Sequence, residues 1–441
     1  MDKNLECMNG KLDGLAARQV AFSVLNDIFF HRRSLDEGLA AARGFDRLAG
    51  RDRAFVRLLV AVVLKRARQM DAVLAHFLHE PLDALKPATL ANVFRLGIAQ
   101  LVFLGTPEHA AVNTTVELAA AERMAHQKAL VNAVMRRLAR EGFPDMTDRD
   151  AGKFNTPEWL WHAWMKDYGV ETALDIAAAN LSDASLDISV KSDAQRWAEK
   201  LGAILLPTGT LRKPVGGFIP DMTGYAEGAW WIQNAAAALP AKLLGDVKGK
   251  TVVDLCAAPG GKTAQLANAG AKVTAVDRSA QRMMRLKENM QRLHFDDVET
   301  VIADGATWKP PQLVDAVLLD APCTATGTIR HQPDILHLKE PKDQEKLVVL
   351  QRRLLLNAAE MLKPGGTLVY CTCSLQKAES EEQAEWVLSQ GLPLQRLPVT
   401  HNGIPELKEM IAERGEIRCL PNQWKDFNGI DGFFVARFAR V

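Results

Sequence analysis

Apolar residues in the first third of the chain recur at the spacing of an α-helix. Between positions 18 and 140 they follow one another three or four residues apart, as in Val20 and Val24, and no alternating strand pattern interrupts them. Prolines, which tend to begin or end helices, fall between the periodic stretches at Pro81, Pro87 and Pro107. The pattern predicts an all-α bundle of about six or seven short helices.

The pattern changes between Phe143 and Gly228. The sequence Thr-Pro-Glu-Trp at 156–159 can open a helix, residues 186–190 have the composition of a strand, and residues 192–201 have the spacing of a second helix. This stretch predicts a small α/β connector between two larger units.

Strand and helix patterns alternate from Thr251 onward. Helical patterns cover 279–293 and 343–362, and Lys-Pro-Gly-Gly at 363–366 should stop the second of them. The strand patterns are TVVDLCA, KVTAVD, VETVIAD, DAVLLDAP and TLVYCTCS. Alternation of this kind predicts a mostly parallel, doubly wound sheet of the Rossmann-like class. The predicted domains are therefore 1–143, 144–228 and 229–441.

Composition supports several globular units. A chain of 441 residues exceeds the usual size of one domain, and 48% hydrophobic with 24% charged residues is the balance of a soluble protein. The formal net charge is +1, but residues 1–143 hold 20 Lys and Arg against 15 Asp and Glu. This basic excess suits either a docked polyanion or a solvated helical surface.

No segment suggests export or a membrane span. The start, MDKNLECMNGKLDG, lacks a basic and an apolar region, and the longest apolar run, 55–64, is short and contains Arg57. We therefore expect a cytoplasmic protein without a membrane partner. A chain of this length with six cysteines does not predict a disulfide framework. The cysteines are Cys7, Cys256, Cys323, Cys371, Cys373 and Cys419.

A glycine turn follows the first predicted strand, where doubly wound sheets bind ligands. The turn matches neither G-x-G-x-x-G nor a phosphate loop, which disfavours dinucleotides and triphosphates. Main-chain N–H groups at a helix start suit the carboxylate of S-adenosylmethionine, and glycines permit its close approach. The residues assigned to this cofactor are Asp254, Cys256, Ala257, Ala258, Pro259, Gly260, Gly261 and Lys262.

Acidic residues close the next strands. Asp277 is placed for the ribose diol, and Asp304, with Gly305 after it, is placed for the adenine edge. Each aspartate could instead cap the following helix. Three such residues in register, with Asp254, favour the cofactor.

Two cysteines stand at the ends of later strands. Cys323 lies in Asp-Ala-Pro-Cys after the fourth strand, and Cys373 lies in Cys-Thr-Cys-Ser at the end of the fifth. Methyl transfer to C5 of cytosine requires a thiolate to add at C6, because C5 is otherwise a poor nucleophile. Methylation of exocyclic amines would more usually place Pro-Pro-aromatic where this chain has Pro322-Cys323.

These motifs together resemble the Sun family of RNA cytosine-C5 methyltransferases, from about Pro157 to the end of the chain. The resemblance implies that Cys373 is the attacking thiolate and that Cys323 assists product release. It also implies that Asp320 hydrogen-bonds the target base and contacts the cofactor, that Lys262 points into the active site, and that Arg278 follows the ribose-binding acid.

The chain departs from that family's pattern at two positions. It has His331 after Arg330 where the family often has a second arginine, and Asn234 after Gln233 where the family often has aspartate. Cys371 is an extra thiol on the same strand face as Cys373. Because the cysteines lack a second paired half, we expect no metal site.

The helical region resembles the NusB family of RNA-binding domains. The similar segments are 51–55, 95–101, 109–113 and 130–137. The fusion resembles bacterial methyltransferases of 16S ribosomal RNA, and we expect a monomer that binds this RNA. Transfer RNA or another RNA as substrate, or a non-catalytic RNA-binding factor, are the alternatives. The RNA-binding candidates are Arg51, Arg53, Arg136, Arg137 and Arg330.

Overall fold

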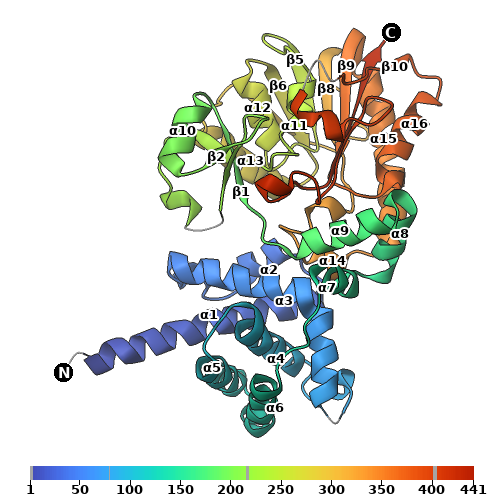
Figure 1. Cartoon of the computed structure of the whole chain (residues 1–441). Coiled ribbons are helices and arrows are strands. Elements are labelled where there is room, and N and C mark those ends of the chain that lie inside the picture. The colour runs from blue at the N-terminus through green and yellow to red at the C-terminus, as the bar shows by residue number, and fades with distance from the viewer. Residues whose placement is uncertain (1–2, 79, 215–217, 401–404) are drawn as a thin grey trace.

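The N-terminal helices pack their apolar faces on one another, as the periodicity predicted. The computed structural model describes residues 3–78, 80–214, 218–400 and 405–441. Val24, Leu59 and Phe94 are fully buried in one core cluster of this region. The helices are α1 Lys3–His31, α2 Leu35–Ala41, α3 Gly50–Phe77, α4 Leu90–Ile98, α5 Glu108–Ala121 and α6 Lys128–Glu141 (Figure 1).

The prediction of uniformly short helices was wrong for α1 and α3, which contain 29 and 28 residues. The chain has no proline before Pro81, so none interrupts these segments. The helix α3 instead kinks at Arg66, where φ is −126° and ψ is 15°. The prolines lie where predicted, since Pro107 caps α5 and Pro87 precedes α4.

A helical hairpin and a small sheet connect the two larger parts. The sheet is antiparallel in the order β2-β3-β1-β4, and its strand β1 is the strand predicted at 186–190. The elements are α7 Asp148–Asn155, α8 Glu158–Tyr168, α9 Val170–Leu181, β1 Leu186–Val190, α10 Ala194–Leu201, β2 Ile204–Leu205, β3 Leu211–Lys213 and β4 Trp230–Ile232.

The C-terminal part is the doubly wound sheet that the alternating pattern predicted. Its order is β10-β12-β9-β8-β5-β6-β7, with β11 paired to β12. The segment from β9 to β7 is parallel, whereas β10, β11 and β12 pair antiparallel. The strands are β5 Thr251–Leu255, β6 Lys272–Asp277, β7 Glu299–Ile302, β8 Val314–Asp320, β9 Leu362–Thr372, β10 Leu394–Arg396, β11 Ile417–Cys419 and β12 Phe433–Arg440.

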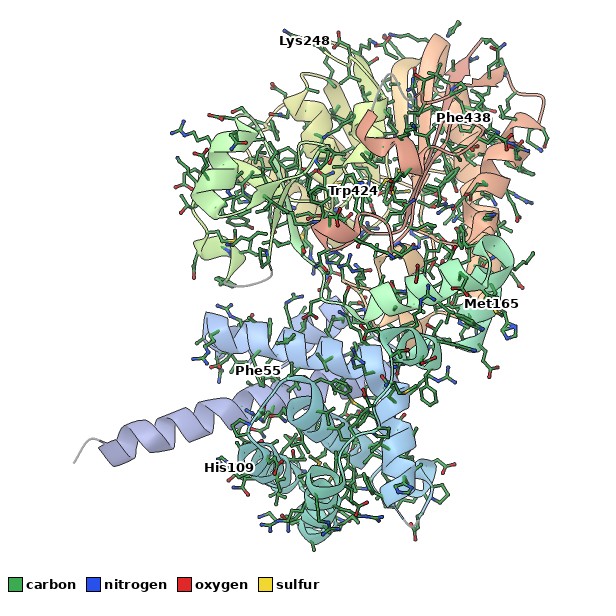
Figure 2. The ribbon with its side chains drawn as sticks, viewed as in Figure 1. Phe55, His109, Met165, Lys248, Trp424 and Phe438 are labelled. Carbon is green, nitrogen blue, oxygen red and sulfur yellow. The ribbon has the colours of Figure 1, made fainter. Side chains whose placement is uncertain are left out.

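Helices cover both faces of this sheet. One core cluster joins α15 and α16 to one face and includes Phe438 of β12, labelled in Figure 2. Two further clusters join α11, α12 and α13 to the other face. The helices are α11 Leu239–Leu243, α12 Gly261–Asn268, α13 Ala280–Arg292, α14 Ile335–Leu338, α15 Pro341–Glu360 and α16 Glu381–Leu388.

Lys-Pro-Gly-Gly at 363–366 ends no helix directly, contrary to the prediction. The helix α15 stops at Glu360, and β9 already begins at Leu362. A register shift between Val314 and Ala316 of β8 accommodates the extra residues of β9. None of the helices in the described ranges combines the length and apolar character that a membrane span requires.

The short helix α14 joins the sheet domain to the helical domain (Figure 1). It contacts α1 and α3, and Leu338 packs against the core of the helical domain. The main-chain N–H of Leu35, at the start of α2, donates to Asp334 Oδ2 at 3.0 Å. The loop that follows β8 therefore extends from the sheet into the helical domain.

Candidate active site

The glycine turn between β5 and α12 brings main chain close to the ligand end of the sheet. Gly260 has φ of +102°, and a Cβ there would meet the side chains of Leu286 at 3.0 Å and Met290 at 3.2 Å. Only glycine fits this position without strain. At Gly261, the first residue of α12, a Cβ would find only ordinary contacts with Gln233 from 3.6 Å. The turn leaves the start of α12 free to present N–H groups to an anion.

Asp254 is the buried acid beneath this turn. Its side chain is fully buried, and Thr263 Oγ1 donates to Oδ2 at 2.6 Å. The other oxygen, Oδ1, has no hydrogen-bond partner among the described residues. Burial raises the pKa of Asp254 to about 7. A buried acceptor without a partner is suited to a ligand that donates a hydrogen bond.

A cavity of about 760 Å³ opens over the turn. This volume lies within the range of about 300–1,000 Å³ that small-molecule sites occupy. Its walls include residues 257–262 of the turn, Asp254, Asp320, His331 and Asp431. A nucleoside with a carboxylate tail fits this site, because the cavity combines helix-start N–H groups with the unpaired Asp254 oxygen.

The two later acids lie outside the cavity lining. Asp277 is buried and accepts main-chain N–H bonds from Ser279 at 2.9 Å and Ala258 at 3.2 Å. Asp304 is exposed and accepts the N–H of Ala306 at 3.0 Å. Neither aspartate caps a following helix, because Ser279 is the N-cap of α13 and the next element after Asp304 is the strand β8. The ribose and adenine roles stay predictions.

The two residues beside these acids differ in exposure. Arg278 is exposed. Gly305 is buried, and its carbonyl accepts a hydrogen bond from Asn357 Nδ2 at 2.8 Å. Neither residue lines the cavity, and their contacts with the cofactor stay predictions.

The buried Lys262 forms an ion pair with the partly exposed Asp320, and both residues line the cavity. Lys262 Nζ lies 2.7 Å from Asp320 Oδ2. Burial lowers the pKa of Lys262, but the charge of Asp320 and its hydrogen bond outweigh burial and raise that pKa above its usual value. Cys371 Sγ donates to the other oxygen of Asp320 at 3.5 Å. The lysine therefore stays charged, and its partner carboxylate is held by two side chains.

Cys323 and Cys373 face each other at the ends of neighbouring strands. The parallel pairing of β8 with β9 brings them together, and their Sγ atoms lie 3.5 Å apart. The contact with Cys373 and burial raise the pKa of Cys323 well above its usual value. The sequence predicted that both cysteines lie at the carboxyl ends of the strands, but it could not predict the distance between them.

Of the other described cysteines, Cys371 and Cys419 are buried and Cys256 is partly buried. Burial, followed by the charge of Asp320, raises the pKa of Cys371 and of Cys256. Cys419 is fully buried beside Met410. Within the described residues, no group of three or more His, Cys, Asp or Glu side chains is arranged to hold a metal ion. The side chain of Cys7 lies outside the described residues.

The arginines predicted to bind RNA do not form one surface. Arg51 is exposed, whereas Arg53 stacks on the ring of Phe218 at 4.1 Å. Arg136 and Arg137 lie on α6, at the end of the helical domain remote from the sheet (Figure 1). The structure thus separates the α6 pair from the α3 pair.

Arg330 is buried between domains rather than exposed to solvent. Its Nη2 donates to the carbonyls of Asp183 at 3.1 Å and Asn428 at 2.7 Å. These bonds favour a structural role for Arg330, linking the connector to a C-terminal loop. Its contact with RNA stays a prediction.

The two departures from the family pattern contact each other. Asn234 Nδ2 lies 3.4 Å from His331 Nε2, and the same nitrogen of His331 lies 3.4 Å from Asp431 Oδ1. All three side chains line the cavity. Sequence alone could not reveal this contact, because 97 residues separate Asn234 from His331.

Comparisons with known proteins agree with this architecture. A family model described as "16S rRNA methyltransferase RsmB/F" matches residues 241–439, and the NusB family model matches residues 15–140. Ribosomal RNA small subunit methyltransferase B of Xanthomonas campestris is 36% identical over 88% of this chain and 90% of its own length. The protein of the same name from Xylella fastidiosa is 34% identical over 97% of this chain and 99% of its own length.

A solved structure shares the fold across nearly the whole chain. The protein PH0851 has a TM-score of 0.77 and 22% identity, and the match covers 97% of this chain and 98% of that one. The arrangement of helical domain, connector and sheet is therefore a known one.

Proposed function

Because the chain belongs to the RsmB/F family of 16S rRNA methyltransferases and carries a NusB-family domain, we propose that it methylates C5 of a cytosine in 16S ribosomal RNA. Cys373 is the covalent nucleophile of this reaction. The observation that carries the proposal is the pair of thiols 3.5 Å apart, at strand ends beside the ion pair of Lys262 and Asp320.

The reaction begins with the addition of Cys373 to the base. Its thiolate forms a bond from Sγ to C6, and the electron pair of the C5=C6 double bond moves to C5, which becomes nucleophilic. The charged Lys262 beside Asp320 stabilises negative charge that develops on the ring, and Asp320 is the residue that hydrogen-bonds the base.

Release is an elimination that follows transfer of the methyl group to C5. The C5 proton passes to water, its bonding electron pair forms the C5=C6 double bond again, and the bond from C6 to Cys373 Sγ breaks with its electron pair returning to sulfur. Cys323 assists this step from 3.5 Å away. The contact with Cys373 and burial raise the pKa of Cys323, which favours its thiol form.

We assign the cavity over the glycine turn to S-adenosylmethionine. When bound, this molecule supplies an electrophilic methyl group. The turn residues 256–262 hold its amino-acid end, Asp254 Oδ1 accepts from it, and Asp277, Arg278, Asp304, Gly305 and Asp320 are the further proposed contacts.

The substrate assignment rests on division of labour between domains. We propose domains at 1–143, 144–228 and 229–441. The helical domain binds RNA phosphates, and the sheet domain binds an unstacked cytosine. Of the candidates for this contact, Arg51 and Arg136 are exposed, Arg53 and Arg137 are partly exposed, and Arg330 is buried. Such a contact should weaken as salt concentration rises.

Two cysteine variants test the chemistry. Cys373→Ser should abolish methyl transfer from labelled S-adenosylmethionine, because serine at this position is not a competent nucleophile. Cys323→Ser should accumulate a covalent protein–RNA adduct, detected as a band that survives denaturation. Cys419→Ala, which changes a buried cysteine outside the cavity lining, is the control. An adduct formed by the Cys373 variant instead would exclude the assignment.

A separate experiment tests the substrate. Bisulfite sequencing of ribosomal and transfer RNA from a deletion strain should show one cytosine of 16S ribosomal RNA losing its methyl group. A loss confined to transfer RNA would contradict the substrate while leaving the chemistry standing.

A further inference from the structure

A buried carboxylate lies directly behind the two thiols. Glu379 is fully buried in the loop after β9, six positions beyond Cys373. Its Oε2 accepts hydrogen bonds from Thr324 Oγ1 at 2.5 Å and Ser374 Oγ at 2.6 Å. Thr324 immediately follows Cys323, and Ser374 immediately follows Cys373. One carboxylate therefore joins the neighbours of both cysteines.

The second oxygen of Glu379 extends this connection. Its Oε1 accepts the main-chain N–H of Thr324 at 3.0 Å and Gln351 Nε2 at 3.1 Å. The same Gln351 nitrogen donates to the carbonyl of Pro322 at 2.8 Å. The residues on both sides of Cys323 are thus fixed by one buried network.

Other contacts hold Glu379 itself and the two loops. Tyr370 donates its hydroxyl to the Glu379 carbonyl at 2.6 Å, and the N–H of Gly327 donates to the Cys373 carbonyl at 2.8 Å. No lysine or arginine of the described residues forms an ion pair with Glu379. A buried charge without an ion pair is costly, and only a full set of donors offsets that cost.

We propose that Glu379 is a positioning residue that sets the distance between the two thiols through Thr324 and Ser374. This inference rests on the proposed two-thiol reaction for its functional meaning, but the geometry it predicts does not require that reaction. Burial raises the pKa of Glu379 above its usual value, and the donated hydrogen bonds offset only part of that rise. The negative charge of Glu379 also contributes to the raised pKa of Cys323.

The matched variants are Glu379→Gln and Glu382→Gln. The first keeps the side-chain shape but replaces one acceptor oxygen with an NH2 donor. The amide can then accept hydrogen bonds at only one of the two oxygen positions, so two of the four donors lose their acceptor. The second makes the same chemical change at an exposed position of α16. Both variants lose one negative charge, so a difference in their rates is due to the change in the buried network.

Disulfide formation driven by diamide measures the thiol geometry without RNA or cofactor. The two thiols lose one hydrogen each to diamide, which becomes a hydrazine, and a bond forms between Cys323 Sγ and Cys373 Sγ. Peptide mass mapping follows this bond with time. We expect Glu379→Gln to form it about tenfold more slowly than Glu382→Gln, because small displacements strongly slow reactions between fixed groups.

Methyl transfer supplies the second readout. Glu379→Gln should lower kcat about 10- to 100-fold while KM for RNA and for S-adenosylmethionine stays within about twofold. If Cys373 is not the nucleophile, kcat will not fall together with the rate of disulfide formation. That rate still tests whether Glu379 positions the two thiols. The proposed reaction and the proposed role of Glu379 can therefore be refuted independently.

Two outcomes would overturn the inference. The first is a disulfide rate for Glu379→Gln equal to that of Glu382→Gln. The second is a slower rate that scales only with the unfolded fraction measured by thermal melting. Should Glu379→Gln not fold, Thr324→Val removes one hydroxyl donor and keeps the carboxylate, and an unchanged disulfide rate in that variant would overturn the inference as well.

Discussion

The pKa of Asp254 predicts an unusual dependence of stability on pH. Burial raises this pKa to about 7 from an ordinary 3.8, so the folded state binds a proton that the unfolded state releases. Stability from this group is therefore greatest below about pH 4 and is lost as pH rises to about 7. The variant Asp254→Asn removes the titration and keeps the side-chain shape.

The expected size follows from the shift. Each pKa unit corresponds to about 1.4 kcal/mol, and a shift of about three units gives at most about 4 kcal/mol between acid and neutral pH. The amide nitrogen of Asn would stand where Oδ1 has no partner, at a cost of about 1–3 kcal/mol at every pH. The variant should be less stable than the wild type at about pH 4.5 and more stable at about pH 8.

The assay is urea unfolding of the ligand-free protein, followed by tryptophan fluorescence across this pH range. Asp315→Asn is the control with the opposite sign. Hydrogen bonds from Lys363 and Thr251 lower the pKa of Asp315 to about 2, so its contribution is present above about pH 4 and lost toward acid. A stability difference between the wild type and Asp254→Asn that stays constant with pH would refute the reasoning.

Two further changes test contacts around the cavity. Arg212→Met should destabilise the protein by about 3–5 kcal/mol in urea unfolding. Arg212 Nε lies 2.7 Å from Asp187 Oδ1, so the variant leaves this carboxylate buried without its partner. A loss below about 1 kcal/mol would contradict this. Although burial lowers the pKa of His331, the neighbouring Asp431 raises it overall, so its contribution is present at low pH and lost as pH rises through the raised value. The stability difference between the wild type and His331→Gln should therefore shrink from about pH 5.5 to about pH 9, and a growing difference would contradict the assignment.

Elements with a strong local pattern could be predicted from the sequence. The parallel strands β5 and β8 are mostly apolar and mostly buried, and such runs belong to strands buried on both faces. The antiparallel strands β10 and β11 contain only three residues each and carry no comparable pattern. Their pairing with β12 depends on contacts across the chain, which periodicity does not encode.

The same limit applies to the site. The glycine turn and each cysteine motif are continuous stretches of sequence. Their residues, and the strand ends at which they lie, could therefore be predicted. The burial of Arg330, the stacking of Arg53 on Phe218 and the role of Glu379 depend on residues remote in sequence. A charged residue in sequence indicates a solvated or ligand-binding side chain, and only the fold reveals that such a side chain links two parts of the protein.

The position of α14 gives the helical domain a second role beside the proposed binding of RNA, which is to anchor the loop that carries Cys323. The loop that carries Cys323 continues into this helix, where His337 Nε2–H donates to the Leu64 carbonyl at 2.8 Å and stacks edge-on against Phe29. Burial lowers the pKa of His337 to about 4, so this contact stays neutral and intact near neutral pH. Because Leu338 is also packed in the core of the helical domain, that domain and the thiol-bearing loop form one continuous body. RNA bound by the helices, as we propose, would thereby be held at a fixed distance from the thiols, which is what a reaction at one chosen base requires.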